Sequence, residues 1–352
     1  MKNLLARPIV RLLLAVVIAV VIIVAPISSS SFINYQLSLI AVFAVALLGL
    51  NIVMGYTGQV SLGQSAFLGL GAYIAAYGVR QEWPVVVIFL LCCIIPAAVG
   101  LLVALAAARL RGLALAMVTI ALPIIGVPLA KRFPDFTGGS VGSTVSWLEA
   151  PEGSGLADDQ FRYYLVVAIA VVLFILGRNL VRGRIGRAFA IVKSNEAVAL
   201  SMGISPYRYK VLAFTIASLF GGASGFLYIA VVQYTSPETL SFATSINLVA
   251  AMVIGGSASI LGTVLGAIYF VMLPVVAGQI DSSRTALISG AALLLVLFLL
   301  PGGLVSLPRR IAQLVRGGRG GSPRSRAAAD RPPTGDTAPR TTAAPEAEKQ
   351  PR

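Results

Sequence analysis

Long runs of apolar residues alternate with short polar stretches along most of the 352-residue chain. A run of about 20 apolar residues forms a helix long enough to cross the hydrocarbon core of a bilayer. Ten runs approach this description, although the third and eighth are short. They lie at about 9–27, 35–55, 64–79, 84–108, 112–130, 163–178, 211–234, 244–256, 260–277 and 285–300. The pattern predicts an all-α polytopic membrane protein with about ten transmembrane helices; eight spans plus re-entrant segments is the alternative.

The same pattern divides the chain into three parts. Residues 1–34 hold an N-terminal span and the first external turn, residues 35–305 the main transmembrane domain, and residues 306–352 a cytoplasmic tail. The tail is basic and rich in Pro, Ala and Arg, so it is expected to be largely disordered. Residues 1–25 also resemble a signal peptide, but no A-x-A cleavage pattern follows them, so we favour a first span that is retained.

One stretch differs from the uniformly apolar spans. Residues 51–73 read NIVMGYTGQVSLGQSAFLGLGAY, which contains five glycines, no charge and a cluster of uncharged hydrogen-bonding side chains. Irregular backbone at membrane depth must face protein or a water-filled cavity, and a hydrophobic segment interrupted by glycine points to a transport site. The stretch therefore predicts spans that are broken by Gly-rich segments and line a pathway.

Candidate pathway residues come from this stretch and from a weaker internal echo of it that begins at Asn247. They are Asn51, Tyr56, Thr57, Gly58, Gln59, Ser61, Gly63, Gln64, Asn247, Gly255, Gly256 and Ser257. In the alternative interpretation the polar side chains join helices by hydrogen bonds, and glycines such as Gly69 and Gly71 allow close helix packing.

The composition makes several classes of mechanism and of functional site less plausible. The chain is 57% hydrophobic and 11% charged, whereas soluble domains carry about a quarter charged residues. It has no histidine, and its two cysteines, Cys92 and Cys93, are adjacent within an apolar run. No acidic or basic residue lies in the middle of a predicted span, which weakens a proton- or ion-coupled mechanism. These features disfavour a membrane-embedded enzyme, and no metal or cofactor is expected in this chain.

Loop charges predict the orientation. The segment 178–210 has seven basic residues and one acid, Glu196, so the positive-inside rule places it in the cytoplasm. The loop after Ala130 contains five acids, at 135, 149, 152, 158 and 159, and is the best candidate for an external loop. Alternation of ten spans then puts both termini in the cytoplasm. The net charge of +14 fits contact with anionic lipid better than nucleic-acid binding.

The cytoplasmic segment also suits docking of a partner protein. Ser194 or Asn195 can cap a short helix, and Gly203 can end it. The candidate coupling residues are Arg187, Lys193, Asn195, Glu196, Val198, Met202 and Gly203. A helix lying on the membrane surface is the alternative. No Gly-Lys dipeptide occurs anywhere, so the chain lacks a phosphate-binding P-loop, and an ATPase would be a separate subunit.

The stretch GYTGQVSLGQSAFLGLGAY resembles the signature of permease subunits of branched-chain amino acid ABC importers, of the LivM type. Four further stretches resemble that family in the same order. They are LRGLALAMVT at 110–119, TGG at 137–139, the segment from Gly186 to Phe214, and GGSAS at 255–259 followed by Gly262. The chain differs from the family pattern at Ala258, where glycine is usual, at Gln64, where histidine is frequent, and in a less charged run at 191–196.

The resemblance implies a mechanism and a set of partners. A second permease subunit of the LivH type would complete the translocation path in the bacterial cytoplasmic membrane. Two cytoplasmic ATPase subunits would bind the coupling helices, and an external binding protein would deliver the substrate. Leucine, isoleucine and valine are the implied substrates, with urea, short amides or sugars as alternatives. A stand-alone carrier or passive channel is the competing hypothesis from another class.

Overall fold

The computed structural model describes residues 24, 26–107, 109–110, 113–151, 155–281, 284–299 and 303–306. All of them belong to one compact unit, Met1–Pro308. Most of the predicted first span at 9–27 and nearly all of the predicted tail at 306–352 lie outside the described residues, as does Arg111.

Each of the nine later predicted spans corresponds to a helix. The helices are α2 (Ser31–Leu50), which continues as the π-helix η1 (Asn51–Tyr56), α3 (Gln64–Arg80), α4 (Val85–Ala107), α5 (Leu113–Arg132), α7 (Asp158–Arg182), α10 (Pro206–Val232), α11 (Phe242–Gly255), α12 (Ile260–Ile280) and α13 (Thr285–Leu299). Within the described residues, six helical stretches are long and apolar enough to cross a membrane, including α2 together with η1. The polytopic helical fold is therefore confirmed, and the exact number of crossings stays a prediction.

Short elements connect the long helices. They are α6 (Pro134–Thr137), α8 (Arg184–Ser194), α9 (Glu196–Ser201), the 3-10 helices η2 (Pro237–Leu240) and η4 (Leu304–Ser306), and the strands β1 (Ser143–Thr144) and β2 (Tyr234–Thr235). The strands pair antiparallel, with Ser143 opposite Thr235. The search for long apolar runs predicts neither α8 nor this strand pair, because α8 is amphipathic and the strands have two residues each.

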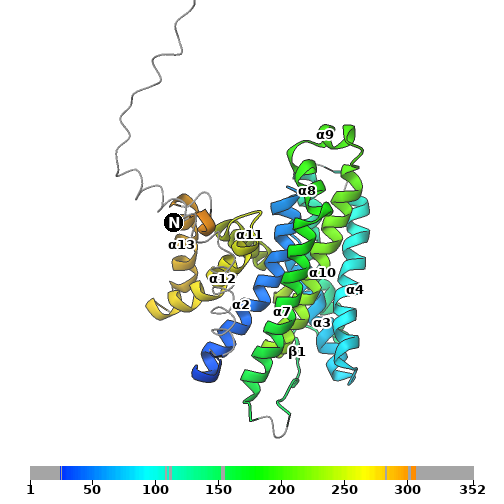
Figure 1. The fold of residues 1–352 in the computed structure, drawn as a ribbon. Helices are drawn as coiled ribbons and strands as arrows, with labels where there is room; N and C mark the ends of the chain where they lie inside the picture. Colours follow the sequence, from blue (N-terminus) through cyan, green and yellow to red (C-terminus); the bar gives the residue numbers. More distant parts are fainter. Residues whose placement is uncertain are drawn as a thin grey trace, which may run out of the picture. The chain divides into compact units, whose positions relative to one another are not determined.

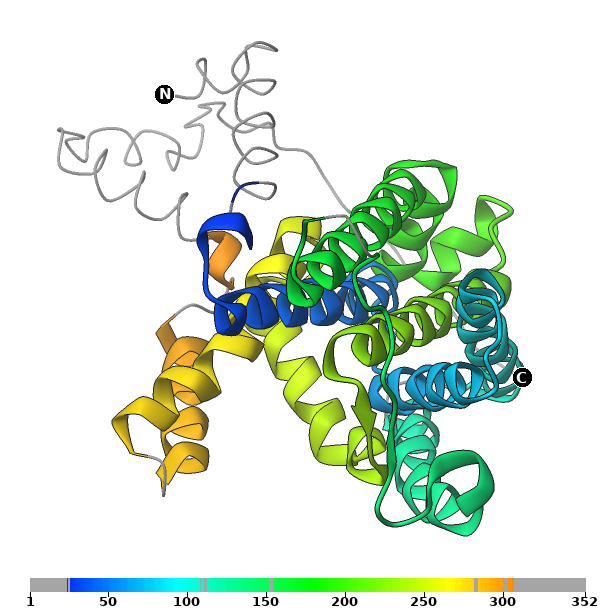
Figure 2. The same cartoon turned by 90° about the horizontal axis from the view of Figure 1, so that it is seen from below.

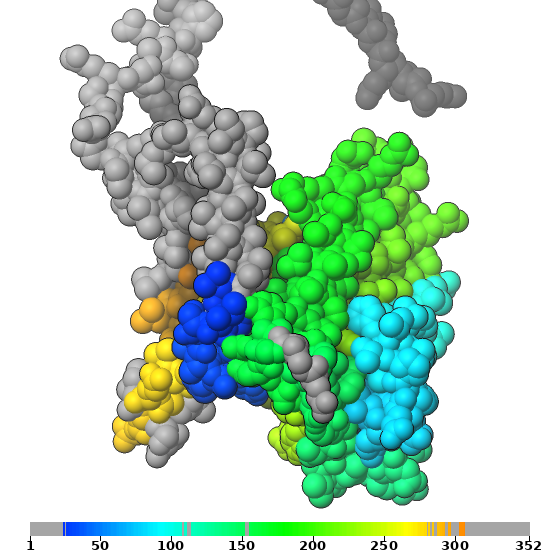
Figure 3. Space-filling view, turned by 60° about the horizontal axis from the view of Figure 1, so that its bottom comes forward, coloured from blue at the N-terminus to red at the C-terminus, as the bar shows by residue number. Residues whose placement is uncertain are grey.

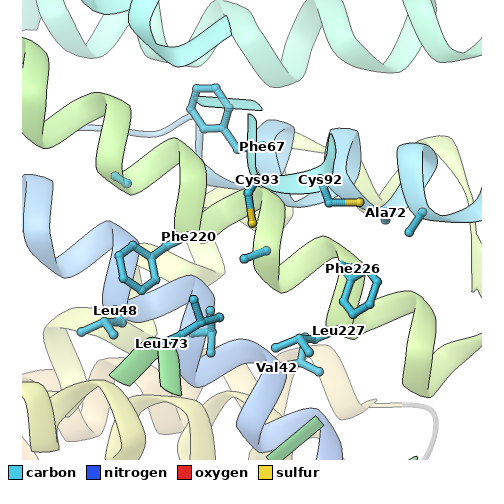
Figure 4. Close-up of a cluster of buried hydrophobic side chains, with 14 of the residues drawn as sticks. Val42, Leu48, Phe67, Ala72, Cys92, Cys93, Leu173, Phe220, Phe226 and Leu227 are labelled. Carbon is cyan, nitrogen blue, oxygen red and sulfur yellow. The ribbon is translucent and has the colours of Figure 1, made fainter. Parts of the chain in front are cut away.

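Helix α10 lies at the centre of the bundle and makes its most extensive contacts with α4, α3 and α2 (Figures 1 and 2). Its apolar side chains, such as Phe220, Phe226 and Leu227, pack with Val42 and Leu48 of α2 in one buried cluster (Figure 4). Cys92 and Cys93 of α4 belong to the same cluster and are free thiols, as their apolar context predicts.

Glycines let α10 approach its neighbours closely. A Cβ atom on Gly222 would lie 2.0 Å from the carbonyl oxygen of Cys92, and one on Gly71 would lie 2.3 Å from the carbonyl oxygen of Gly222. A Cβ on Gly69 would meet Leu240 at 2.6 Å. The packing role expected for Gly69 and Gly71 is therefore confirmed. In a membrane the hydrophobic effect does not drive helices together, so their association depends on close packing, which small residues at the crossings allow.

The outward faces of α4 and α7 are apolar. Exposed side chains include Leu90 and Leu102 of α4 and Val172 and Leu176 of α7, and these helices occupy neighbouring parts of the face shown in Figure 3. Exposed apolar side chains along two long helices are typical of contact with lipid.

The two loops with opposite predicted sidedness lie at opposite ends of the bundle. Figure 1 shows α8 and α9 at one end and β1 at the other. At the α9 end, the Arg109 guanidinium lies 6.0 Å from the ring centre of Tyr207. At the β1 end, Asn34 Nδ2 donates to Asp159 Oδ2 at 2.8 Å. This separation is the arrangement that the charge pattern requires.

Candidate functional site

The Gly-rich stretch forms a break with two parts. The π-helix η1 ends at Tyr56, residues 57–63 are non-helical, and α3 begins at Gln64. Burial alternates along the non-helical part: Thr57, Gln59 and Ser61 are buried, whereas Gly58 and Val60 are exposed. Burial thus repeats every two residues, although Thr57 has helical backbone angles and Gly58 has a φ of +73°. For brevity we call this non-helical link, residues 57–63, the extended segment.

The buried polar side chains of the break bond to helix carbonyls within the same subunit. Gln59 Nε2 donates to Thr57 Oγ1 at 2.9 Å and to the Lys210 carbonyl at 3.3 Å. Gln64 Nε2 donates to the carbonyls of Ala46 at 3.1 Å and Ala217 at 3.3 Å. For Gln59 and Gln64 the structure therefore favours the second interpretation of the sequence, in which these groups hold helices together.

Asn51 joins the break to the second Gly-rich turn, residues 255–259. Its Nδ2 donates to the Ser259 carbonyl at 2.9 Å, and its Oδ1 accepts from the Ala258 amide at 2.8 Å. Ala258 has a φ of +57°, in the left-handed region that favours glycine. This is the position at which the family pattern has glycine, so the two hydrogen bonds of Asn51 help to hold a strained turn.

The other pathway candidates occupy different surroundings. Gly255 and Gly256 are buried in the second turn, while Asn247 and Ser257 are exposed. Tyr56 is the last residue of η1 and is half-buried. A Cβ on Gly63 would lie 2.9 Å from the Thr119 carbonyl of α5, so this glycine permits close contact between the break and α5.

The segment that the loop charges predict to be cytoplasmic forms two helices, α8 and α9, where the sequence predicts a short helix capped at Ser194 or Asn195. Asn195 is the cap: its Oδ1 accepts from the amides of Ala197 at 2.8 Å and Val198 at 3.4 Å. Gly203 ends the segment with a φ of +75°, as expected from its position after the helix. The sequence therefore predicts the N-cap and the C-terminal end of α9 correctly, but it does not predict α8.

The surface of α9 is apolar and open. Val198 is 47% exposed, Leu200 62% and Met202 63%. A hollow of about 470 Å³ lies beside them and is lined by Val192, Lys193, Ser194, Asn195, Glu196, Ala197 and Leu200. Arg187 of α8 is exposed as well. An exposed apolar patch with a polar rim is the kind of surface that partner proteins cover.

Two charged contacts join this segment to the break. Lys193 Nζ donates to the Gly55 carbonyl of η1 at 2.5 Å. Glu196 Oε1 and Lys210 Nζ lie 2.6 Å apart, and the carbonyl of Lys210 accepts from Gln59. The first contact reaches η1 directly, and the second connects α9 to the extended segment through Lys210 of α10.

An apolar cavity of about 670 Å³ lies between α3, α4 and α5. Phe67, Val103, Leu122 and Ile125 line it, together with Tyr73. The buried Tyr73 hydroxyl has no hydrogen-bond partner among the described residues. The cavity has the volume and lining of a site for a small, mainly aliphatic molecule.

Comparison with known proteins identifies the family of this fold. Residues 32–299 match the family described as the permease component of branched-chain amino acid transport systems. The chain is 32% identical over 309 residues to the high-affinity branched-chain amino acid transport system permease protein LivM of Escherichia coli K12, covering 80% of this chain and 71% of that protein. It is 30% identical over 307 residues to the LivM protein of Salmonella typhimurium, covering 78% and 70%. No solved structure matches the chain. The chain belongs to the family of permease components of branched-chain amino acid transport systems.

Proposed function

We propose that this chain is one of two permease subunits of an ATP-driven importer, and that the importer carries leucine, isoleucine and valine. The second permease subunit would be of the LivH type. Two cytoplasmic P-loop ATPases and an external substrate-binding protein complete the complex. The observation that carries the proposal is the family match, which extends over residues 32–299 and so includes both Gly-rich turns and the α8–α9 segment.

The chemistry of the interior supports this substrate class. The apolar cavity beside α3 suits an aliphatic side chain, and its lining contains no charged residue that would hold a zwitterion tightly. Release of the solute after each cycle requires such weak binding. Urea and sugars would need many more hydrogen-bonding groups than Tyr73 and Thr137 provide in this lining.

The position of α9 supports the coupling role. Its apolar side chains are exposed at the end of the bundle opposite β1, and the segment is tied to the break through Lys193 and Lys210 (Figure 1). With this end in the cytoplasm, the chain would cross the bacterial cytoplasmic membrane about ten times and have both termini inside.

Uptake of radiolabelled leucine tests the function. Cells carry this chain with its neighbouring transport genes, and the matched strain has an ATPase whose P-loop lysine is replaced. We expect leucine uptake only with the working ATPase. Uptake that persists without it would favour a carrier or channel, and ATPase-dependent uptake of urea but not leucine would keep the mechanism and reject the substrate.

The Val198→Asp variant tests docking. A charge on the exposed α9 patch opposes burial against the ATPase, and we expect at least roughly tenfold less ATPase to co-purify, equivalent to about 1.4 kcal/mol. Arg208→Ala is the matched control, since Arg208 is also exposed near this end but lies outside the patch. Equal co-purification of both variants and wild type would show that α9 is not the docking surface.

A further inference from the structure

The two faces of the extended segment differ in character. Its polar side chains point into the subunit, and the side chains that remain on the outer face are apolar or absent. Val60 is 40% exposed, whereas the adjacent Ser61 is 3% exposed. Gly58 is exposed and Leu62 is half-buried on the same outer face. The sequence T-G-Q-V-S-L shows the same alternation of polar with apolar or glycine positions, with a period of two.

The outer face lies within the depth of the helix bundle. The segment begins beside Lys210 and ends beside Ala217 of α10, as the bonds of Gln59 and Gln64 show. These seven residues of α10 correspond to about 10 Å along the helix axis. The segment therefore descends by about two helical turns from the end of the bundle that carries α9.

Contact between this outer face and lipid would be unfavourable. The amides of Val60 and Ser61 donate no hydrogen bond to any described residue, in contrast to Leu62, whose amide donates to Thr119 Oγ1 at 3.0 Å. Unsatisfied backbone amides cost several kcal/mol in hydrocarbon, so such backbone lies against protein or water.

The position of the Lys193 side chain indicates that water reaches the outer face at Gly58. Its side chain is exposed and its stem passes over Gly58, where an added Cβ atom would lie 3.1 Å from Lys193 Cγ. The ammonium donates one hydrogen bond to Gly55 and has three protons, so the remaining donors require solvent at this point. The outer face of the extended segment thus opens at a hydrated end of the bundle.

We propose that Gly58, Val60 and Leu62 form part of the wall of the translocation path at its cytoplasmic end, and that the Val60 side chain contacts the passing solute. The inference rests on the proposed function. An aliphatic solute meets an apolar side chain there, while the Val60 amide, which donates to no described residue, offers a hydrogen bond to its carboxylate. The buried polar side chains hold this wall in place, and the backbone together with Val60 is the surface that the solute meets.

Cysteine accessibility tests the proposal in the complete transporter. Val60→Cys and Ser61→Cys are prepared as neighbours on opposite faces, and inside-out vesicles are treated with the charged, water-soluble thiol reagent MTSET. The natural Cys92 and Cys93 are buried, so wild type supplies the background rate. We expect Val60→Cys to react roughly tenfold faster than Ser61→Cys, because exposure controls thiol reactivity, and leucine to slow the reaction.

Three results would overturn the proposal. Equal, slow reaction of both variants would place Val60 away from water. Spontaneous disulfide formation between two Val60→Cys chains, with no access for the reagent, would show that this face is a contact between subunits. Fast reaction that leucine leaves unchanged, in vesicles that transport leucine, would exclude contact with the solute. Failure of the proposed function would appear separately, as absence of ATP-dependent uptake by the wild-type complex.

Discussion

Replacing Lys193 by methionine is expected to reduce ATP-driven uptake at least roughly tenfold while the ATPase subunits remain bound and active. Lys193 Nζ donates to the Gly55 carbonyl, and this bond joins α8 to the π-helix at the break. A hydrogen bond from a charged donor contributes about 1.5–3 kcal/mol. Methionine keeps the length and apolar stem of the side chain but cannot make the bond, so α8 and α9 would move without moving the break.

The measurement is leucine uptake alongside ATP hydrolysis by the same purified complex in liposomes. Lys193→Arg is the matched control, because it keeps the charge and several donors, and it should retain most of the uptake. Wild-type uptake by Lys193→Met would show that the bond to Gly55 does not transmit motion. Loss of ATPase binding, in contrast, would assign Lys193 to the docking surface.

Substituting Gly222 by valine is expected to destabilise the folded permease by more than about 3 kcal/mol, at the upper end of the cost of overpacking. The new Cβ would lie 2.0 Å from the Cys92 carbonyl and 2.5 Å from Pro96 Cγ of α4. Because the nearest atom belongs to backbone, α10 and α4 would have to separate. The substitution therefore disrupts the packing of α10 against α4, which is the most extensive helix contact in the bundle.

Thermal unfolding in detergent, followed by tryptophan fluorescence or by retention of monodisperse protein, measures this effect. Gly290→Val in α13 is the matched control, since a Cβ on Gly290 meets nothing within 4 Å among the described residues. We expect a clear fall in Tm for the first variant and little change for the second. Equal Tm values would show that α10 and α4 can separate at low cost.

The sequence predicts the helices well because the membrane imposes a simple rule. Length and hydropathy alone locate the ends of α4 to within one residue and those of α7 to within five, and the short apolar run at 244–256 matches α11. The same rule says nothing of α8, whose arginines and apolar residues alternate at helical spacing outside the apolar runs. It also misses β1 and β2, because their pairing joins residues about 90 positions apart.

Whether each polar residue lines a pathway or bonds to another helix is harder to predict from the sequence. Asn51, Gln59 and Gln64 are uncharged polar groups in a Gly-rich break, which is equally typical of a pathway and of a helix contact. Their partners are carbonyls of Ser259, Lys210 and Ala217, which lie 151 to 208 residues away along the chain. Only the folded arrangement supplies that information. The two-residue period of 57–62 was nevertheless visible and identifies Val60 as an outward residue.

The bonds of Asn51 to Ala258 and Ser259 also constrain biogenesis. The chain is synthesised at about 5–20 residues per second, so more than 200 residues correspond to roughly 10–40 seconds between the two partners. During that time α2 and its break are made, while the turn that accepts their polar side chain does not yet exist. The nascent chain must keep Asn51 in contact with water, the insertion machinery or a temporary partner. The order of synthesis thus delays both bonds of Asn51 until the chain has been made as far as Ser259.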